Sequence, residues 1–554
     1  MKGSLRKEPV YEERSFPVFL ALLCLILYIP HIGGRDLWCG RETLYAEVAR
    51  DILLNGHWFV PYFNGELYYN KPPLFFWLIA FASMPAGDIT EFTLRLPGAL
   101  SALGTVLVVY YLGKRIYNAR AGFLAGMILA TSPGFYKYAC VAKLESPLTL
   151  FITASIAAFY LGFAGSSNNK KWYFLSGWFL MGLAMLTKGL GVMLIAPVIL
   201  LYLASRRELG RVWEMKPVLG GLVLLATMGV WLLPGYLIGG PEYIEGLIGH
   251  FGYHIGKGLS FKKFLYYVTE SFVGTLPWSL IFPALFFYFY RRRDGVDAGQ
   301  KEALRLSAVW FIAMWIVFSL IMAKRSRYIL PMYPAVALAA GIVWEECIAR
   351  APETWSKIKL IPVVIFSFLA GTAVVLVRYH FIVLTPVVGG MVALCLIVLF
   401  SGWFLSVRSG QYKALFISFL IVIISFETTY LRLALPIESQ AGAEKAVCEK
   451  ALANMEPGAR WTLYKYFSPD FVFYGRTNIK SIGTEGDLAN FLSSKERVYC
   501  IIKEADYAEL DLSAFNVSAF KITELKKVGK RTTMFLLISN RPNKAGPVST
   551  GTKI

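Results

Sequence analysis

Runs of about twenty consecutive apolar residues recur along most of this 554-residue chain, and they restrict its fold more than any other feature. Inside a lipid bilayer no water is available to hydrogen-bond the backbone, so each spanning segment must pair its own N–H and C=O groups. Hydrophobic residues make up 56% of the chain and charged residues 17%. The sequence therefore predicts an α-helical, polytopic membrane protein.

We predict about thirteen transmembrane helices from the apolar runs. The first run, FPVFLALLCLILYIPHI, follows a basic start as a signal peptide would, but no small-residue cleavage site follows it, so we expect a retained helix. The run PLFFWLIAFASMPAG is short and interrupted, which predicts an interfacial helix that does not cross. The predicted spans are residues 16–32, 97–116, 120–135, 147–165, 172–187, 189–205, 217–238, 264–290, 306–323, 328–346, 359–377, 383–405 and 414–431.

The basic residues between these runs predict the orientation of the chain. With the N-terminus in the cytoplasm, loops such as GKRIYNAR, SRRELGR and RRRDG all fall on the cytoplasmic side, as the positive-inside rule requires. The formal net charge of +20 is thereby explained by topology, and we predict no nucleic-acid partner. An odd number of spans places the C-terminus on the outer side of the membrane.

The composition changes near Pro436, which predicts two domains. Residues 1–435 form the transmembrane domain, including outer-face amphipathic helices at about 40–90. In residues 436–554 the apolar runs shorten to strand length, as in WTLYKYF, RVYCIIK and TMFLLIS, and the segment SQAGAEKAVCEKALANM is typical of a helix. We predict a small soluble α/β domain that ends in a disordered tail. The spacing of Cys448 and Cys500 leaves their pairing open.

The predicted outer loops carry more positive charge than that side of a membrane protein normally does. One explanation is ion pairing with nearby Asp and Glu within a packed outer layer. The other is a cavity that binds anions, because lipid-linked phosphates are held by Lys and Arg. The cations in question are Arg35, Arg41, Lys71, Lys137, Lys143, Lys188, Lys257, Lys262, Lys263, Lys324, Arg325 and Arg327.

Four places in these loops supply the candidate functional residues. ETLYAEVARDILLNG has a helical apolar stripe and starts with Glu42, near the positive end of the helix dipole. LYYNKPPLFFW holds Lys71 against a Pro-Pro turn, LAMLTKGLG places Lys188 between two apolar runs, and MAKRSRYILP groups three cations ahead of Tyr328. His250 and His254 are four residues apart, as two metal ligands on one helix face would be, but no acidic residue or Cys lies close by to complete a site.

These motifs resemble membrane glycosyltransferases of the C-type superfamily, and within it the lipid A aminoarabinose transferases and their protein O-mannosyltransferase relatives. The resemblance runs over nearly the whole chain, through LYAEVARDIL, GHWFVPYFNGELYYNKPPLFFW, KLESPLTLF, LTKG and RYILP. It implies the C-type fold, with about thirteen helices and a periplasmic α/β domain, in the bacterial inner membrane. It also implies a sugar donor linked to undecaprenyl phosphate and an envelope acceptor such as lipid A.

The resemblance implies roles for individual residues, and this chain departs from the family pattern at three of them. Where relatives have an Asp-Glu pair, this chain has Arg41 and Glu42, and the second-loop Asp is Glu145. Asn70 replaces a Glu associated with a metal site, so we predict no required metal. We assign Glu42, Glu145 and Arg41 to catalysis. Donor and phosphate binding is assigned to Tyr69, Lys71, Lys188, Arg327 and Tyr328.

The predicted reaction is therefore transfer of a sugar, 4-amino-4-deoxy-L-arabinose or a related one, from undecaprenyl phosphate to a lipid A phosphate. A hydroxyl acceptor would need a carboxylate base, whereas an ionised phosphate would not, and a cation at position 41 suits the second case. Two alternatives remain: transfer to protein or another envelope glycan, and a flippase that binds lipid-linked sugar without chemistry.

Overall fold

The computed structural model describes residues 10–37, 41–165, 169–189, 191–255, 264–276, 278–280, 297–320, 324–349, parts of 394–429, 444–510, 517–525 and 533–541. The chain divides into two compact units. Unit 1 consists of Met1–Gly33, Tyr69–Leu78 and Arg95–Tyr430. Unit 2 consists of Gly34–Tyr68, Ile79–Leu94 and Leu431–Ile554. A stretch of the early chain thus belongs with the C-terminal residues.

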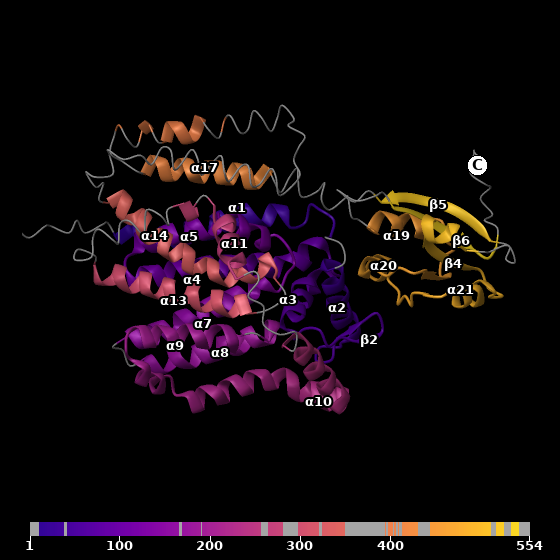
Figure 1. Ribbon diagram of the computed structural model, residues 1–554, viewed down its shortest axis with the longest axis horizontal. Helices are drawn as coiled ribbons and strands as arrows, with labels where there is room; N and C mark the ends of the chain where they lie inside the picture. The colour runs from indigo at the N-terminus through magenta and orange to yellow at the C-terminus, as the bar shows by residue number, and fades with distance from the viewer. Residues whose placement is uncertain are drawn as a thin grey trace, which may run out of the picture. The chain divides into compact units, whose positions relative to one another are not determined.

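Unit 1 is a bundle of helices that lie side by side in Figure 1. Neighbouring pairs in the bundle are α7 with α8, α5 with α14, α8 with α10, and α9 with α13. The helices with residues in this unit are α1 (Val10–Tyr28), α3 (Leu74–Ser83), α4 (Glu91–Ile116), α5 (Ala119–Ala130), α6 (Pro133–Ala139), α7 (Glu145–Ala164), α8 (Lys170–Lys188), α9 (Gly191–Ser205), α10 (Pro217–Ile255), α11 (Tyr266–Gly274), α13 (Ala298–Leu320), α14 (Tyr333–Ala349) and α17 (Lys413–Thr429). The 3-10 helices η3 (Leu209–Met215) and η5 (Ser326–Met332) connect some of them.

Small residues allow two of these helices to pack backbone against backbone. Where α4 meets α5, a Cβ atom added at Gly122 would lie 2.4 Å from the Tyr110 carbonyl oxygen, and one at Gly113 would lie 2.7 Å from Gly122 Cα. Both separations are shorter than real Cβ contacts, so the α4–α5 contact requires glycine at these positions. Close approach through small residues is typical of membrane helix pairs.

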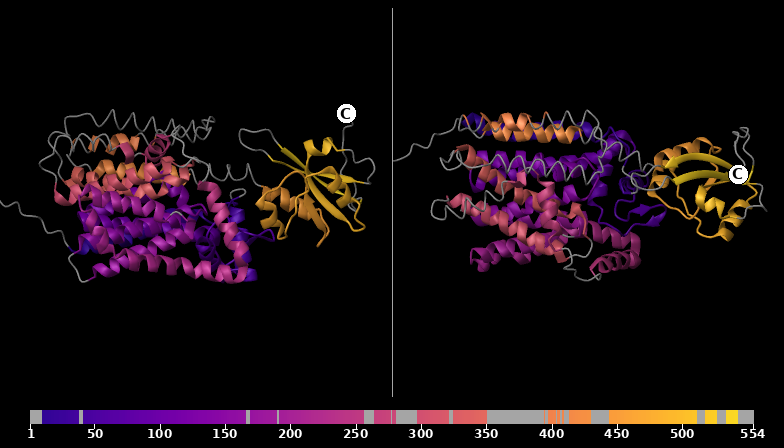
Figure 2. Two further views of the ribbon diagram at one scale, coloured as in Figure 1. Left: turned by 60° about the horizontal axis from the view of Figure 1, so that its bottom comes forward. Right: turned by 45° about the horizontal axis from the view of Figure 1, so that its top comes forward.

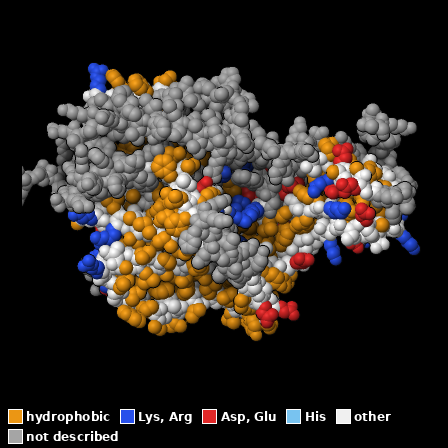
Figure 3. All heavy atoms as spheres, viewed as in Figure 1, with side chains coloured by type: hydrophobic (Ala, Val, Ile, Leu, Met, Phe, Trp, Pro, Cys, Tyr) orange, Lys and Arg blue, Asp and Glu red, His pale blue; other side chains and the backbone are white. Residues whose placement is uncertain are grey.

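The prediction of a polytopic helical protein is confirmed. Within the described residues, six helical segments are long and apolar enough to cross a membrane: Arg14–His31, Glu91–Ile116, Glu145–Ala164, Pro217–Gly249, Ala298–Leu320 and Ser326–Glu346. Four shorter apolar helices accompany them, including Leu74–Ala86 at the run predicted not to cross. The face of the helical unit in Figure 3 is largely hydrophobic where its residues are described, as a lipid-facing surface should be.

The first-loop part of unit 2 contains the predicted amphipathic helix, α2 (Glu42–Asn55), which begins at Glu42 as expected. A two-residue hairpin of β1 (Tyr62–Phe63) and β2 (Glu66–Leu67) follows it. Asn64 and Gly65 form its turn, with φ of 56° and 80°, which is the backbone that an Asn-Gly turn favours.

An amphipathic α2 is expected to turn its charged residues away from the apolar stripe and toward solvent, and Arg50 departs from this expectation. Arg50 is buried, and it donates to the carboxylates of Glu47 and Asp88 and to the carbonyl oxygen of Phe473. The side of α2 that the sequence predicts to be polar therefore packs inside unit 2.

The C-terminal part of unit 2 is an α/β sandwich of three layers, visible in Figure 2. Its sheet has the order β3-β4-β6-β5, with β3 parallel to β4 and the other pairs antiparallel. Two helices pack on each face of the sheet. The strands are β3 (Arg460–Leu463), β4 (Val498–Lys503), β5 (Ser518–Leu525) and β6 (Thr533–Ser539), and the helices are α19 (Glu444–Ala453), α20 (Pro469–Gly475), α21 (Glu485–Leu492) and α22 (Glu504–Ala508).

The structure answers the open question of Cys448 and Cys500. Both are free, buried thiols. Cys448 lies in the core between the sheet and α19, whereas Cys500 lies in the core on the opposite face, under α21. The sheet itself separates them, so no disulfide joins them.

Several sequence predictions fall outside the described residues. They are the span 359–377, most of 383–405 and the second half of 264–290, the cations Lys257, Lys262 and Lys263, and the tail from residue 542.

Candidate active site: a buried carboxylate held by two cations

The ends of three helical elements in unit 1 meet at Glu145. The residue begins α7, where the free N–H groups and the helix dipole favour a negative charge. Lys188 is the last residue of α8, where the dipole favours a positive charge, and Gly189 ends that helix in the left-handed conformation with φ of 73°. Arg327 comes from η5. The two α-helices, α7 and α8, therefore each present to this point the charge that their own helix end stabilises.

The three side chains form one ion-pair cluster. Lys188 Nζ lies 2.8 Å from Glu145 Oε1, and Arg327 Nε lies 3.0 Å from the same oxygen. The exposed fractions of the side chains are 3% for Glu145, 10% for Lys188 and 18% for Arg327. Coulomb attraction is strong at such low exposure, so the carboxylate is held firmly in its ionised form.

Positive charge exceeds negative charge at this cluster. Lys143, nine-tenths buried and two residues before Glu145, adds a third cation within electrostatic reach of the carboxylate. The Tyr328 ring lies beside them, with Lys188 Nζ 4.4 Å and Arg327 Cζ 5.6 Å from its centre. One carboxylate cannot neutralise both Lys188 and Arg327, so the cluster is suited to take up a further anion such as a phosphate.

The structure thus brings together four of the predicted site residues, namely Glu145, Lys188, Arg327 and Tyr328. Both explanations of the outer cations apply here, because these Lys and Arg residues are ion-paired and yet retain excess positive charge. Tyr69 and Lys71 have their described contacts elsewhere in unit 1. The Tyr69 ring lies 5.8 Å from that of Tyr243 in α10, and Lys71 Nζ donates to the Asn70 carbonyl oxygen at 2.6 Å.

Glu42 and Arg41 belong to unit 2 and differ sharply in exposure. Glu42 is fully buried, with its Oε2 3.7 Å from Nη1 of Arg35, which is also buried. Arg41 is exposed at the position just before α2. Glu42 therefore sits in a dry, positively charged setting, whereas the adjacent cation reaches solvent.

No metal site is formed by the described residues. They contain no group of three or more His, Cys, Asp or Glu side chains placed to hold a metal ion. Asn70, which stands at the position of an expected metal-site Glu, is exposed. His250 and His254 lie in α10, and their side chains are outside the described part of the chain.

Sequence reasoning missed a pair of buried carboxyl groups in unit 2. Glu444 and Asp470 are 4% and 2% exposed, and the Ser468 hydroxyl contacts both, at 3.4 Å and 2.7 Å. Tyr466 also donates to Glu444. Burial, followed by the hydrogen bond and charge of Glu444, raises the pKa of Asp470 to about 7. The segment YKYFSPD carried a signal, since Ser before Pro-Asp is a helix N-cap pattern.

Comparison with known proteins gives the class to which the chain is similar, the polytopic membrane glycosyltransferases. Residues 70–233 match the family model described as dolichyl-phosphate-mannose-protein mannosyltransferase. A crystal structure of ArnT from Cupriavidus metallidurans bound to undecaprenyl phosphate superposes with a TM-score of 0.76 at 20% identity, covering 96% of this chain and 99% of that one. That likeness shows the fold.

Two relatives are similar to this chain over more than half of its length. An uncharacterised protein of Aquifex aeolicus is 30% identical over 348 residues, 62% of this chain and 67% of the relative. The undecaprenyl phosphate-alpha-4-amino-4-deoxy-L-arabinose arabinosyl transferase of Edwardsiella ictaluri is 30% identical over 338 residues, and the match spans 58% of each protein. The chain belongs to the C-type superfamily of membrane glycosyltransferases, in the group that contains ArnT and the protein mannosyltransferases.

Proposed function

We propose that this protein transfers 4-amino-4-deoxy-L-arabinose, or a closely related sugar, from undecaprenyl phosphate to a lipid A phosphate. The reaction would take place on the periplasmic face of the bacterial inner membrane. The observation that carries the proposal is the cluster of Glu145, Lys188 and Arg327, which holds excess positive charge where helix ends of unit 1 meet. The names of the relatives specify a sugar linked to undecaprenyl phosphate, and this supports the choice of donor.

The architecture that goes with this function is also a proposal. About thirteen helices would cross the membrane, with the N-terminus in the cytoplasm. Residues 1–435 would form the catalytic domain and residues 436–554 the periplasmic domain. Helix α2 would lie on the outer side of the membrane, with Val48 and Ile52 of its apolar stripe buried within the protein.

The cations of the cluster account for stabilisation of the leaving group. Displacement at an anomeric carbon passes through an oxocarbenium-like state while negative charge grows on the leaving phosphate. Lys188 and Arg327 would stabilise that phosphate, and Tyr328 would line the donor site beside them. Because Glu145 is already bound by both cations, its role would be to hold them in place, not to accept a proton.

The nucleophile decides whether a base is needed. An ionised lipid A phosphate can attack without losing a proton, whereas a hydroxyl of a protein or glycan requires a carboxylate base. Glu42, buried beside Arg35, is the remaining candidate base. A phosphate acceptor therefore predicts that Glu42→Gln keeps measurable transfer, and complete loss of transfer in that variant would favour the hydroxyl acceptor.

The test is mass spectrometry of lipid A from a Gram-negative strain that lacks its own transferase but makes the lipid-linked aminopentose. Expression of the wild-type chain should add an aminopentose to a lipid A phosphate. No gain from a protein shown to be folded in the membrane would overturn the choice of sugar and acceptor. Radiolabelled donor in proteoliposomes addresses the flippase alternative, since a flippase would move the donor and leave its sugar–phosphate bond intact.

A further inference from the structure

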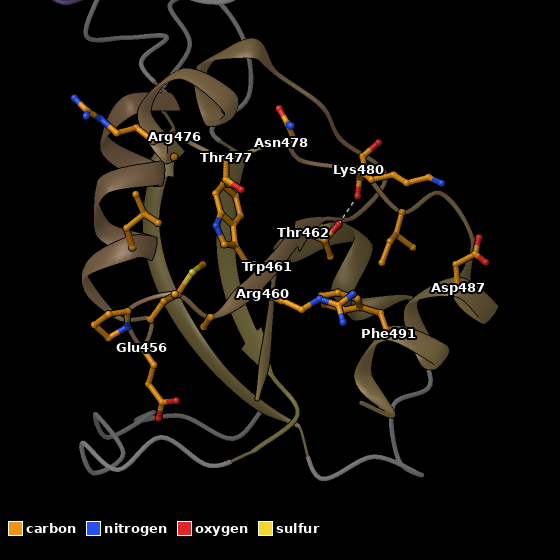
Figure 4. A pocket seen from close by; sticks show the side chains of 18 residues that line it. Glu456, Arg460, Trp461, Thr462, Arg476, Thr477, Asn478, Lys480, Asp487 and Phe491 are labelled. Atoms are coloured by element: carbon orange, nitrogen blue, oxygen red, sulfur yellow. Dashed lines mark hydrogen bonds between the residues drawn. The ribbon is translucent and has the colours of Figure 1, made fainter. Parts of the chain in front are cut away.

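A hollow of about 890 Å³ lies in unit 2, and nothing in the transfer reaction uses it. Its walls all come from the C-terminal α/β part: the end of α19 and the turn after it, edge strand β3, the segment 475–482, and α21. Figure 4 shows the Trp461 ring standing within the hollow beside Thr477, with Arg460 extending toward Phe491. Small-molecule sites in proteins commonly have volumes of about 300–1,000 Å³.

The floor of the hollow is fixed by specific contacts. The Thr462 hydroxyl donates to the Lys480 carbonyl oxygen at 2.6 Å, and Ile482 N–H donates to the Leu463 carbonyl oxygen at 2.8 Å. Asn64 holds the same segment through two hydrogen bonds to the backbone of Ile479, at 2.7 and 2.9 Å. The segment 478–482 is therefore seated against β3 as part of the folded unit.

The aromatic platform is also set in place. A Cβ atom added at Gly475 would lie 2.5 Å from Trp461 Cζ2, so the indole ring packs directly against this glycine. Phe471 meets the ring edge-on at 6.5 Å between centroids. The ring is only partly buried, which leaves part of it available to a ligand. A rigid aromatic ring binds at low entropic cost because little side-chain freedom is lost.

Some charged residues that line the hollow are ion-paired and others are not. Glu456 is paired with Arg497 at 2.7 Å, Arg476 with Asp88 at 2.6 Å, and Asp487 accepts the Thr484 hydroxyl at 2.6 Å. Figure 4 shows Glu456 and Arg476 directed away from the centre of the hollow. Among the described residues, Arg460 and Lys480 make no ion pair or side-chain hydrogen bond. Within the described part of the chain, the lining therefore offers two cations without an ion-pair partner, Arg460 and Lys480, together with an aromatic ring and one carboxylate, Asp487, that is hydrogen-bonded but not ion-paired.

We propose that this hollow binds a phosphorylated hexosamine or a glycan that carries one. A sugar ring presents a C–H face that packs on an aromatic ring, and its hydroxyl or amino groups suit the exposed Thr477, Asn478 and Ser481. The phosphate pairs with Arg460 and Lys480. The proposal does not depend on the transfer reaction, because every residue that it uses is outside the Glu145 cluster.

The test is isothermal titration calorimetry on the full-length protein in lipid nanodiscs with glucosamine 6-phosphate, glucosamine and inorganic phosphate as separate probes. Glucosamine 6-phosphate should bind at least about tenfold more tightly than either other probe, since only it engages both the ring and the cations. Equal affinity for inorganic phosphate would overturn the saccharide part of the proposal. Undetectable binding of glucosamine 6-phosphate would overturn the site.

Variants locate the binding within the chain. The double substitution Arg460→Gln with Lys480→Gln should weaken binding of glucosamine 6-phosphate by at least about tenfold. Trp461→Phe, which keeps an aromatic ring, should weaken it less than Trp461→Ala. Lys495→Gln, an exposed lysine of the same unit outside the hollow, is the matched control and should bind like the wild type. Unchanged binding in the double variant would place the probe elsewhere and reject the proposal.

Discussion

At the scale of single residues, Glu145 is the position on which the proposed site depends most. Its carboxylate is the shared partner of Lys188 and Arg327, so Glu145→Gln leaves two largely buried cations without their anionic partner. Breaking a buried ion pair costs roughly 3–5 kcal/mol. We expect the rate of sugar transfer to fall by at least about 100-fold, because the cations lose the group that positions them. Glu145→Asp keeps the charge and should be intermediate.

The measurement is the initial transfer rate per folded protein, with folding checked by thermal unfolding of each variant. Glu302→Gln is the matched control, since it breaks the 2.8 Å pair of Glu302 with Arg206 in the same unit. That variant should lose stability and keep its transfer rate. A wild-type rate in Glu145→Gln would show that the cluster is structural only.

Lys188 should control use of the donor. Its ammonium group touches Glu145 and lies over the Tyr328 ring, so Lys188→Ala removes both charge and contact. We expect the KM for the lipid-linked donor to rise by about tenfold or more. The KM of Lys188→Arg should lie between those of the wild type and Lys188→Ala. Lys71→Ala should weaken donor use as well. Lys170→Ala, at the other end of α8 and 40% exposed, is the control. Unchanged donor KM in the Lys188 and Lys71 variants would remove the phosphate-binding role.

The sequence indicated these residues but not their arrangement. An ionisable side chain between apolar runs, such as Lys188, is costly in a membrane and so marks a functional position. The pairing of Glu145 with Lys188 joins residues 43 positions apart, and only the packing of α7 on α8 determines it. Burial of Arg50 was missed for a similar reason, because the stripe on α2 gives no sign that α20 packs against it.

At the scale of elements, α20 carries a pH dependence that its buried carboxyl groups impose. The pKa of Asp470 is raised by burial and by Glu444 to about 7, above its unfolded value of 3.8. The folded state therefore holds a proton that the unfolded state releases. This contribution to stability is fully present below about pH 4 and is lost as the pH rises through about 7.

Hydrogen exchange of α20 in the full-length protein, measured between pH 5 and 8, tests this. After correction for the intrinsic exchange rate, protection should fall across this range by an amount equivalent to roughly 2–4 kcal/mol. Asp470→Asn removes the titrating group and should flatten the profile. Asp487→Asn, an exposed carboxylate on α21, should leave it unchanged. A pH-independent wild-type profile would contradict the shared proton.

Sequence patterns located most elements, and their failures have physical causes. Strands β3, β4 and β6 lie where apolar runs predicted them, but β5 was missed because its residues, SAFKITEL, mix polar and apolar types at the sheet edge. The predicted span 217–238 ends just before Gly240, where φ of 68° interrupts α10. The helix then resumes at a Pro-containing segment, which composition alone reads as a loop.

At the scale of the whole molecule, we propose that the two ends of the chain lie on opposite sides of the membrane, as a positive-inside orientation with an odd number of spans would require. Gly210→Cys in η3 and Asn490→Cys in α21 report on this, because both positions are exposed and Gly210 has open space for a side chain. In intact spheroplasts a membrane-impermeant maleimide should label Cys at 490 and leave 210 unlabelled until the membrane is permeabilised. The native Cys24, Cys140, Cys448 and Cys500 are buried and give little background, and the wild-type chain controls for the remaining thiols. Labelling of both positions, or of 210 alone, would refute the proposed topology. Labelling of 210 alone would also place the α/β unit in the cytoplasm, away from any acceptor on the outer face.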